Sequence, residues 1–226
     1  MTEAIDIPKQ VPIMTLRSAV LFPQAIMPLF IFEPRYRQML RDVLAKDRIF
    51  AVAALNEGDE ATESAETPHS IAGIGVVRAC RQNADGSSNL ILQGLARVEF
   101  ETIICETPYR RASIRQIASE PGGSQAHIAT HYQRLLGLLQ TQRRLGADIP
   151  AEALQFIAAL RDPEKALDLA IYTLCPSASL KQALLETTAI VTRFERFETF
   201  LQTEIKRLKL DLKLRGGLDD EQLGNN

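Results

Sequence analysis

Residues 25–44 read AIMPLFIFEPRYRQMLRDVL, and the spacing of the apolar residues changes within this stretch. Up to residue 32 both alternating sets of positions are apolar, which is typical of a β-strand covered on both faces. Further on, apolar residues recur three and four positions apart, at Tyr36, Met39, Leu40, Val43 and Leu44. That spacing predicts a helix with one buried stripe, and Pro34 favours its start because the first helical position needs no hydrogen-bond donor.

The rest of the first half has the pattern of a β-protein. Further strands are predicted over residues 11–16, 19–22, 49–55, 74–80, 90–93, 97–104 and 111–117. Asp85-Gly86 favours a hairpin turn, and the acidic residues between Asn56 and Pro68 indicate a solvated loop. Short strands at regular spacing with one inserted helix predict a small closed or nearly closed β-barrel.

The second half has helical spacing throughout, after a boundary at Glu120-Pro121-Gly122-Gly123. Helices are predicted around residues 128–139, 150–160, 163–174, 179–182 and 194–212. We therefore expect an α+β protein with a β-rich subdomain over 1–118, an α-helical subdomain over 124–215 and a frayed tail over 216–226. The apolar stripe of the last long helix, which includes Phe194, Phe197 and Leu201, is predicted to be core.

The composition is that of an ordinary globular protein, with 26 basic and 28 acidic residues and a net charge of −2. This balance gives no electrostatic reason to expect nucleic acid or an anionic membrane as the main partner. Three scattered cysteines, Cys80, Cys105 and Cys175, fit a reducing compartment. The acidic start is unlike a signal peptide, and no apolar run is long enough to span a bilayer, so we expect a cytoplasmic protein.

No catalytic constellation is found in the sequence. There is no phosphate-binding Gly-x-x-x-x-Gly-Lys run and no Gly-x-Ser-x-Gly nucleophile motif. His127 and His131 have the i, i+4 spacing of two zinc ligands, but Ile128 stands where a helix-borne zinc hydrolase has its glutamate. We therefore expect a protein that is not an enzyme and that binds neither a metal nor another cofactor.

Several segments together resemble one family. They are PIMTLRSAVLFPQAIMPLFIFEPRYRQML at 12–40, GIGVVRACRQNADGSSNLILQGLARVEF at 73–100 and RFERFETFLQTEIKRL at 193–208. They are similar to the N-terminal, substrate-recognition domain of Lon proteases, in a free-standing form without the ATPase and peptidase domains. The resemblance runs over residues 11–214 and implies a PUA-like pseudo-barrel followed by a helical bundle that ends in a long helix. Gln24 replaces the glycine usual in the family after the Phe-Pro pair.

The resemblance also implies a function. A domain of this kind binds unfolded or degron-bearing polypeptides, here as an adaptor or holdase, with a protease or chaperone as a further partner. An RNA-binding module of PUA-like type is the alternative, because similar pseudo-barrels occur in RNA-binding proteins, and the acidic balance counts against it. An enzyme with an unrecognised site is the third reading, which the absence of catalytic motifs disfavours.

The candidate polypeptide site is the segment around the strand-to-helix change. Its residues are Phe22, Pro23, Phe30, Phe32, Glu33, Arg35, Tyr36 and Arg37. Three of the nine phenylalanines fall here, and an apolar patch with a charged rim suits extended hydrophobic ligands. The alternative is that the rings fill the barrel, which we favour for Phe30 and Phe32. Arg35 and Arg37 lie off the apolar stripe of the predicted helix, so we expect both to face solvent as contacts.

Overall fold

The computed structural model describes residues 5–56 and 67–214, and the chain forms two compact units. The first unit comprises Met1–Ala118 and Cys175–Glu186, and the second comprises Ser119–Leu174 and Thr187–Asn226. Most of the predicted acidic loop and the whole predicted tail lie outside the described residues.

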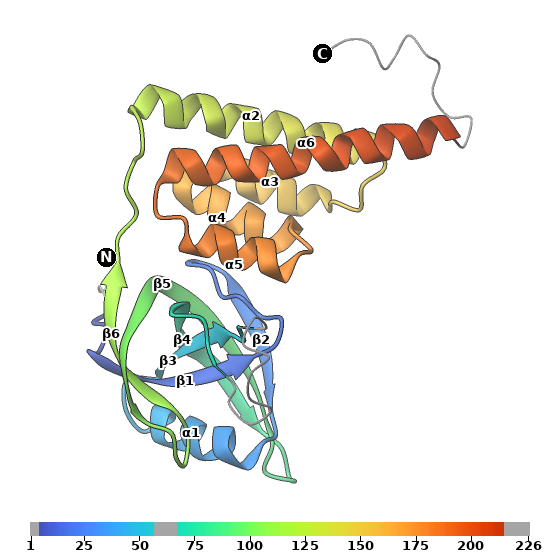
Figure 1. The fold of residues 1–226 in the computed structure, drawn as a ribbon. Coiled ribbons are helices and arrows are strands. Elements are labelled where there is room, and N and C mark those ends of the chain that lie inside the picture. Colours follow the sequence, from blue (N-terminus) through green and yellow to red (C-terminus); the bar gives the residue numbers. More distant parts are fainter. Residues whose placement is uncertain (1–4, 57–66, 215–226) are drawn as a thin grey trace. The chain divides into compact units, whose positions relative to one another are not determined.

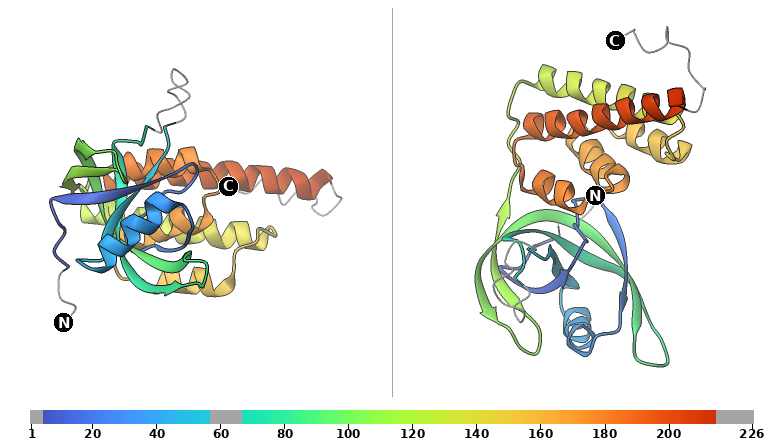
Figure 2. Two further views of the ribbon diagram at one scale, coloured as in Figure 1. Left: turned by 90° about the horizontal axis from the view of Figure 1, so that it is seen from below. Right: turned by 45° about the vertical axis from the view of Figure 1, so that its right-hand side comes forward.

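The first unit is a barrel-like sheet with two helices (Figures 1 and 2). Its elements are β1 (Gln10–Leu16), β2 (Ile26–Ile31), α1 (Pro34–Leu44), β3 (Ile49–Ala54), β4 (Ile71–Gln82), β5 (Ser88–Cys105), β6 (Arg111–Ile117) and α5 (Ala178–Glu186). The strand order is β2-β5-β4-β3-β1-β6, and a β5–β6 pairing closes the ring. Only β1 and β3 are parallel among these pairs. The predicted α+β fold with a pseudo-barrel and one inserted helix is confirmed.

Strand β5 closes the barrel because it is long enough to serve two neighbours on one side. Its first part pairs with β2 and its second part with β6, while β4 runs along the other side. The sequence predicted two strands here, with a break around Gly94. The strand instead continues through Gly94, where a Cβ atom would overlap the carbonyl oxygen of Phe22. The glycine thus allows a close approach of two backbones and does not end the strand.

The predicted strand over 19–22 is wrong. The segment lies between β1 and β2 and crosses the sheet, with the backbone of Leu21 against Gly73 and that of Phe22 against Gly94. Both side chains are fully buried, so the apolar pattern reports burial without strand pairing. The chain then turns at Gln24, whose φ of 66° lies in the left-handed region that glycine adopts most easily.

The close approach at Gly73 leads to a stability prediction. Gly73→Ala would push a methyl group into the carbonyl of Leu21, so we expect a loss of about 1–3 kcal/mol, as is typical of overpacking. Gly137→Ala is the matched control, because open space surrounds that position in helix α2 (Gln125–Arg144), and it should stabilise by roughly 0.5–1 kcal/mol. Urea unfolding of both variants measures this, and equal midpoints would refute the role of Gly73.

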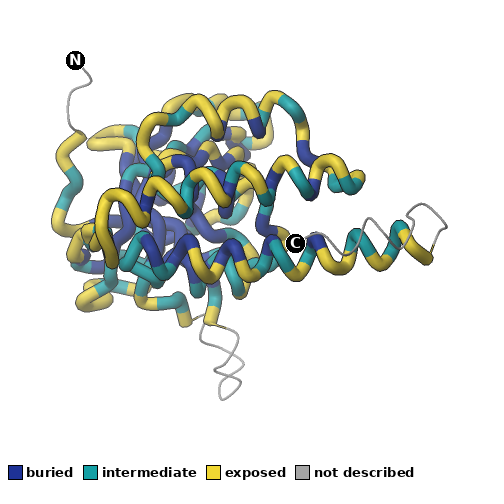
Figure 3. The backbone as a smooth tube through the Cα atoms, turned by 90° about the horizontal axis from the view of Figure 1, so that it is seen from above, coloured by how far each residue is buried: buried dark blue, intermediate teal, exposed yellow. Residues whose placement is uncertain are grey.

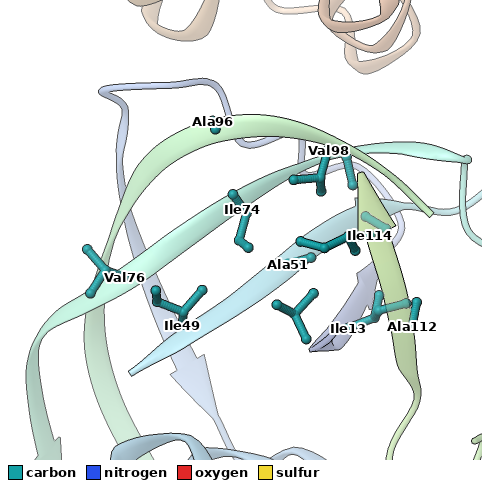
Figure 4. Close-up of a cluster of buried hydrophobic side chains, with 12 residues drawn as sticks. Ile13, Ile49, Ala51, Ile74, Val76, Ala96, Val98, Ala112 and Ile114 are labelled. Carbon is teal, nitrogen blue, oxygen red and sulfur yellow. The ribbon is translucent and has the colours of Figure 1, made fainter. Parts of the chain in front are cut away.

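Small and branched side chains fill the barrel interior (Figure 4). The cluster consists of Val11, Ile13, Ile49, Ala51, Ala53, Ala72, Ile74, Val76, Ala96, Val98, Ala112 and Ile114. Alanines at five of these positions keep the interior narrow. No phenylalanine belongs to the cluster, and Phe100 only packs against it as a partly buried residue.

Two tyrosine hydroxyl groups attach helix α1 to the rest of the first unit. The Tyr36 hydroxyl donates to the carbonyl oxygen of Thr15 at 3.2 Å and accepts from its N–H at 3.1 Å. The Tyr109 hydroxyl donates to Asp42 Oδ2 at 2.8 Å. Burial, and then this carboxylate, raises the pKa of Tyr109 to about 12, while the same hydrogen bond lowers the pKa of Asp42. Helix α1 is therefore joined to β1 at its first turn and to the segment between β5 and β6 further along.

Helix α5 comes late in the chain but packs on the strands. Gln182 Nε2 donates to the carbonyl oxygen of Ile71 at 2.9 Å, and Arg97 Nε donates to that of Leu185 at 3.1 Å. These two bonds, together with the burial of Leu184 and Leu185, explain why α5 belongs to the first compact unit. The division into subdomains 1–118 and 124–215 remains a proposal.

The described part of the second unit, which ends at residue 214, contains the helices α2, α3 (Ala151–Ala159), α4 (Pro163–Leu174) and α6 (Ile190–Leu214). Ser124 caps α2, because its hydroxyl accepts from the N–H of His127 at 3.2 Å. The stripe of α6 is buried from Val191 to Ile205, whereas Leu210 and Leu214 are exposed (Figure 3). The prediction that this stripe is core is confirmed for its first four turns.

Candidate functional site

An apolar surface of the first unit lies on one face of strand β2 and continues to Phe32. Ile26, Pro28, Phe30 and Phe32 alternate along the chain and are exposed, with fractions of 55% for Phe30 and 61% for Phe32. The partly exposed Ile91 of β5 lies directly opposite Pro28. We call these five residues the β2 patch. It is apolar and formed mainly by one extended segment.

A groove of about 460 Å³ adjoins the β2 patch. Its lining residues come from three neighbouring strands: Pro28, Leu29 and Phe30 of β2, Ala79, Cys80 and Arg81 of β4, and Asn89, Leu90 and Ile91 of β5. Arg81 is the only charged group among them. A surface of this kind offers apolar contact to an extended ligand and one cationic anchor.

The exposure of Phe30 and Phe32 overturns two expectations. The strand was predicted to be covered on both faces, and the two rings were favoured as barrel filling. In the structure β2 pairs with β5 alone among the described strands, and only its Met27 and Ile31 side is buried. The two rings instead stack on each other, with centroids 5.8 Å apart. The two apolar sides of the strand therefore have different places: one side packs in the core, and the other forms an exposed apolar surface.

Three of the predicted site residues lie inward. Phe22 and Tyr36 are buried, and Pro23 is partly buried beside Phe22. The ring of Phe22 lies 5.7 Å from the guanidinium of Arg97, and the hydroxyl of Tyr36 is engaged by Thr15. These residues belong to the interior of the unit, and the buried rings of Phe22 and Tyr36 are not accessible to a ligand.

The charged residues of the predicted site do not line the groove. Arg35 binds Glu33 Oε2 at 2.9 Å, lies over the ring of Tyr36 and lines a separate small cavity with Arg110. Arg37 packs against the turn between β4 and β5, where a Cβ atom on Gly86 would overlap its guanidinium. Both arginines are partly buried, so the expectation that they face solvent is only partly met.

Arg37 also acts on the electrostatics of that turn. The hydroxyl of Ser87 donates to Asp85 Oδ1 at 2.6 Å, and this hydrogen bond is the main cause that lowers the pKa of Asp85. The charge of Arg37 lowers it further. Arg37 therefore stabilises the hairpin that carries one end of the groove.

Neither histidine of the i, i+4 pair is arranged as a metal ligand would be. His131 Nδ1 lies 2.8 Å from Glu198 Oε1, while the ring of His127 lies near Gly123. Within the described ranges, no three His, Cys, Asp or Glu side chains come together to hold a metal ion. Of the helices in the same ranges, none combines the length and hydrophobicity needed to cross a membrane.

The comparison with protein families decides what kind of domain carries this patch. Residues 10–203 match the family described as the ATP-dependent protease La (LON) substrate-binding domain. This chain belongs to that family. The match covers β1 to β6, α1 to α5 and the first part of α6, and thus includes the β2 patch.

Relatives of this Lon substrate-binding domain are whole proteases. The Lon protease of Desulfosudis oleivorans is 26% identical over 95% of this chain, and Lon protease 1 of Herpetosiphon aurantiacus is 28% identical over 95%. The alignments cover only 26% and 27% of those proteins. The chain thus spans about a quarter of the length of the curated relatives it matches.

Solved structures share the fold of this Lon substrate-binding domain. The N-terminal domain of the Mycobacterium avium complex Lon protease matches 88% of this chain and 98% of its own length, with a TM-score of 0.65 at 17% identity. A Lon N-terminal domain protein from Xanthomonas campestris matches 83% and 96%, with a TM-score of 0.57 at 19% identity. These likenesses concern the fold alone.

Sequence reasoning missed three of the five residues of the β2 patch. Ile26, Pro28 and Ile91 were absent from the predicted site, although Ile26 and Pro28 alternate in step with Phe30 and Phe32. A proline within a strand was the available signal, because proline is confined to edge strands, ends and bulges. Ile91 could not be identified because its place depends on the pairing register of β2 with β5.

Proposed function

We propose that this Lon substrate-binding domain recognises unfolded or degron-bearing polypeptides through the β2 patch. The observation that carries the proposal is the pair of stacked, exposed rings of Phe30 and Phe32 beside an apolar groove. Exposed apolar patches are rare on a protein without a partner, and an extended strand face suits an extended ligand. Proteins with buried hydrophobic segments offer such ligands only when they are unfolded.

The family supports the same reading at a coarser level, since its description is that of a substrate-binding domain. The solved structures that share the fold are N-terminal domains of Lon proteins, and we propose that the chain itself is not catalytic. It would act in the cytoplasm as an adaptor or holdase that needs no ATP. A protease or chaperone would then receive the bound polypeptide.

We expect the affinity to be modest. The patch is small and already formed, whereas the ligand loses conformational freedom on binding. This combination favours a dissociation constant on the order of micromolar. Weak binding also suits a protein that must release what it holds.

The test is a fluorescence titration with a reduced, unfolded model protein. The Phe30→Ala/Phe32→Ala double variant should bind at least about 10-fold more weakly, because about 1.4 kcal/mol of apolar contact accounts for that factor. Phe156→Ala is the matched control, since this phenylalanine of α3 is 60% exposed but lies far from the patch in sequence and in the other unit. It should bind like the wild type.

Further outcomes of the titration test the charged residues, the location of the site and the class of ligand. Arg35→Ala should change the affinity little, because Arg35 lies outside the groove and pairs with Glu33. Equal loss in the double variant and in Phe156→Ala would refute the β2 patch as the site. Tighter binding of an RNA oligonucleotide than of unfolded protein would favour the RNA-binding alternative instead.

A further inference from the structure

The second unit contains a large groove that the proposed function does not use. Helices α2 and α6 lie side by side and run in the same direction (Figures 1 and 2). The groove along them has a volume of about 980 Å³, and its described lining residues all belong to these two helices. They recur three and four positions apart, so each helix contributes one stripe. Two parallel stripes of this kind form the seat for a third helix.

The floor of the groove is apolar and open. Leu138, Ile205 and Leu210 supply the apolar side chains, and Leu210 is more than half exposed. Gly137 lies in the middle of α2, where glycine is unfavourable, and nothing stands within 4 Å of the position that its Cβ would take. The open space at Gly137 is one that a side chain of a ligand would fill.

The rim of the groove is cationic. Arg134, Arg144, Lys206, Lys209 and Lys213 line it, and none of the described lining residues is acidic. Glu198 neutralises part of this charge, because its carboxylate lies 3.4 Å from Arg134 Nε and also binds His131.

Two further carboxylates of α6 lie along the same helix but engage a residue outside the groove. Glu204 and Asp211 pair with Arg207, at 2.8 and 3.8 Å. Arg207 is not among the lining residues. The groove therefore keeps a net positive charge in a protein whose overall charge is −2.

From this combination we infer that the α2–α6 groove binds an acidic amphipathic helix of a partner protein. Its apolar residues would recur at i, i+3, i+4 and i+7 and pack on the floor, and its aspartates and glutamates would face the rim. The same two helices of a second copy of the chain are excluded as the occupant, because their basic side chains would face the basic rim of the groove. Nucleic acid is disfavoured because the floor is aliphatic and no aromatic residue among the described lining offers a stacking surface. The inference does not depend on the β2 patch, which lies in the other unit.

The inference is tested with a fluorescent 20-residue helical peptide that carries leucines at this spacing and glutamates beside them. Anisotropy titration with the full chain should give a dissociation constant below about 100 µM, and the same peptide with lysines for glutamates should not bind. Arg144→Glu and Lys206→Glu/Lys209→Glu should each weaken binding at least about 10-fold. Added salt should weaken it as well, because the rim is exposed.

Arg143→Glu is the matched control for charge. Arg143 precedes Arg144 in the last turn of α2 and is also exposed, but it does not line the groove. Arg143→Glu changes the net charge and the charge at the end of α2 by the same amount as Arg144→Glu does. It should nevertheless leave the affinity within about 2-fold of the wild type. Gly137→Leu tests the shape, since it should block the groove and abolish binding without lowering the melting temperature.

Three results would overturn the inference. The first is no binding of the acidic peptide to the wild-type chain at about 100 µM. The second is equal weakening by Arg143→Glu and Arg144→Glu, which would indicate non-specific attraction. The third is displacement of the peptide by an RNA oligonucleotide that binds more tightly and loses affinity in the same variants, which would make the groove a nucleic-acid surface.

Discussion

Asp168→Ala is expected to destabilise the chain by about 3–5 kcal/mol, because it would leave the charge of Arg193 buried without its nearest partner. The Arg193 side chain is fully buried, and its Nη1 lies 2.8 Å from Asp168 Oδ1 and 3.2 Å from Glu164 Oε1. Glu164 is partly exposed, so it replaces Asp168 only in part. Urea unfolding followed by far-ultraviolet circular dichroism measures the loss.

The other hydrogen bonds of Arg193 explain why the cation is placed there at all. Nε donates to the carbonyl oxygen of Thr187 at 2.9 Å, and Nη2 donates to that of Thr188 at 3.2 Å and to Ser119 Oγ at 2.9 Å. One side chain thus joins the chain segments before α2 and before α6 to helix α4. Buried polar networks of this kind stabilise only when every member is satisfied.

Lys165→Ala is the control for the Asp168 prediction. Lys165 pairs with Asp162 at 3.4 Å, but both side chains are about half exposed, so the pair contributes little. Its removal should leave the unfolding midpoint unchanged within error. A similar loss for Lys165→Ala and Asp168→Ala would contradict the assignment of the stability to the buried network.

The sequence predicted most of the fold because the relevant signals are local. The change of spacing at Pro34 is a property of neighbouring residues, and so is the stripe of α6, and both were predicted correctly. The errors arose where the conformation depends on distant residues. Leu21 and Phe22 resemble a strand, yet they lie where Gly73 and Gly94 admit a crossing segment.

The candidate site was harder to predict for the same reason. Phe30 and Phe32 were selected correctly as members of an aromatic cluster, but periodicity cannot distinguish the inner from the outer face of an edge strand. Arg37 was expected in solvent because its helix stripe is polar, whereas the structure places it against Gly86, 49 positions further along the chain. Charge alone likewise could not show that Lys206 and Lys209 share a groove with α2.

Phe197→Ala is expected to cost about 3–5 kcal/mol, as large-to-small changes of buried aromatic residues do. Phe197 is fully buried on the stripe of α6 between Phe194 and Leu201, and its ring stacks on that of Phe200 with centroids 5.9 Å apart. The substitution would leave a cavity under the buried stripe of α6, because a closely packed interior relaxes only in part around a lost ring.

The surface phenylalanine of the same unit, Phe156, provides the comparison for Phe197. Phe156→Ala removes the same atoms from an exposed helical position, so the free energy of unfolding should stay the same or rise slightly. Thermal unfolding of the two variants separates burial from residue type. An unchanged midpoint for Phe197→Ala would mean that the stripe is not the core of this unit, and a seam between two copies of the chain would then explain it better.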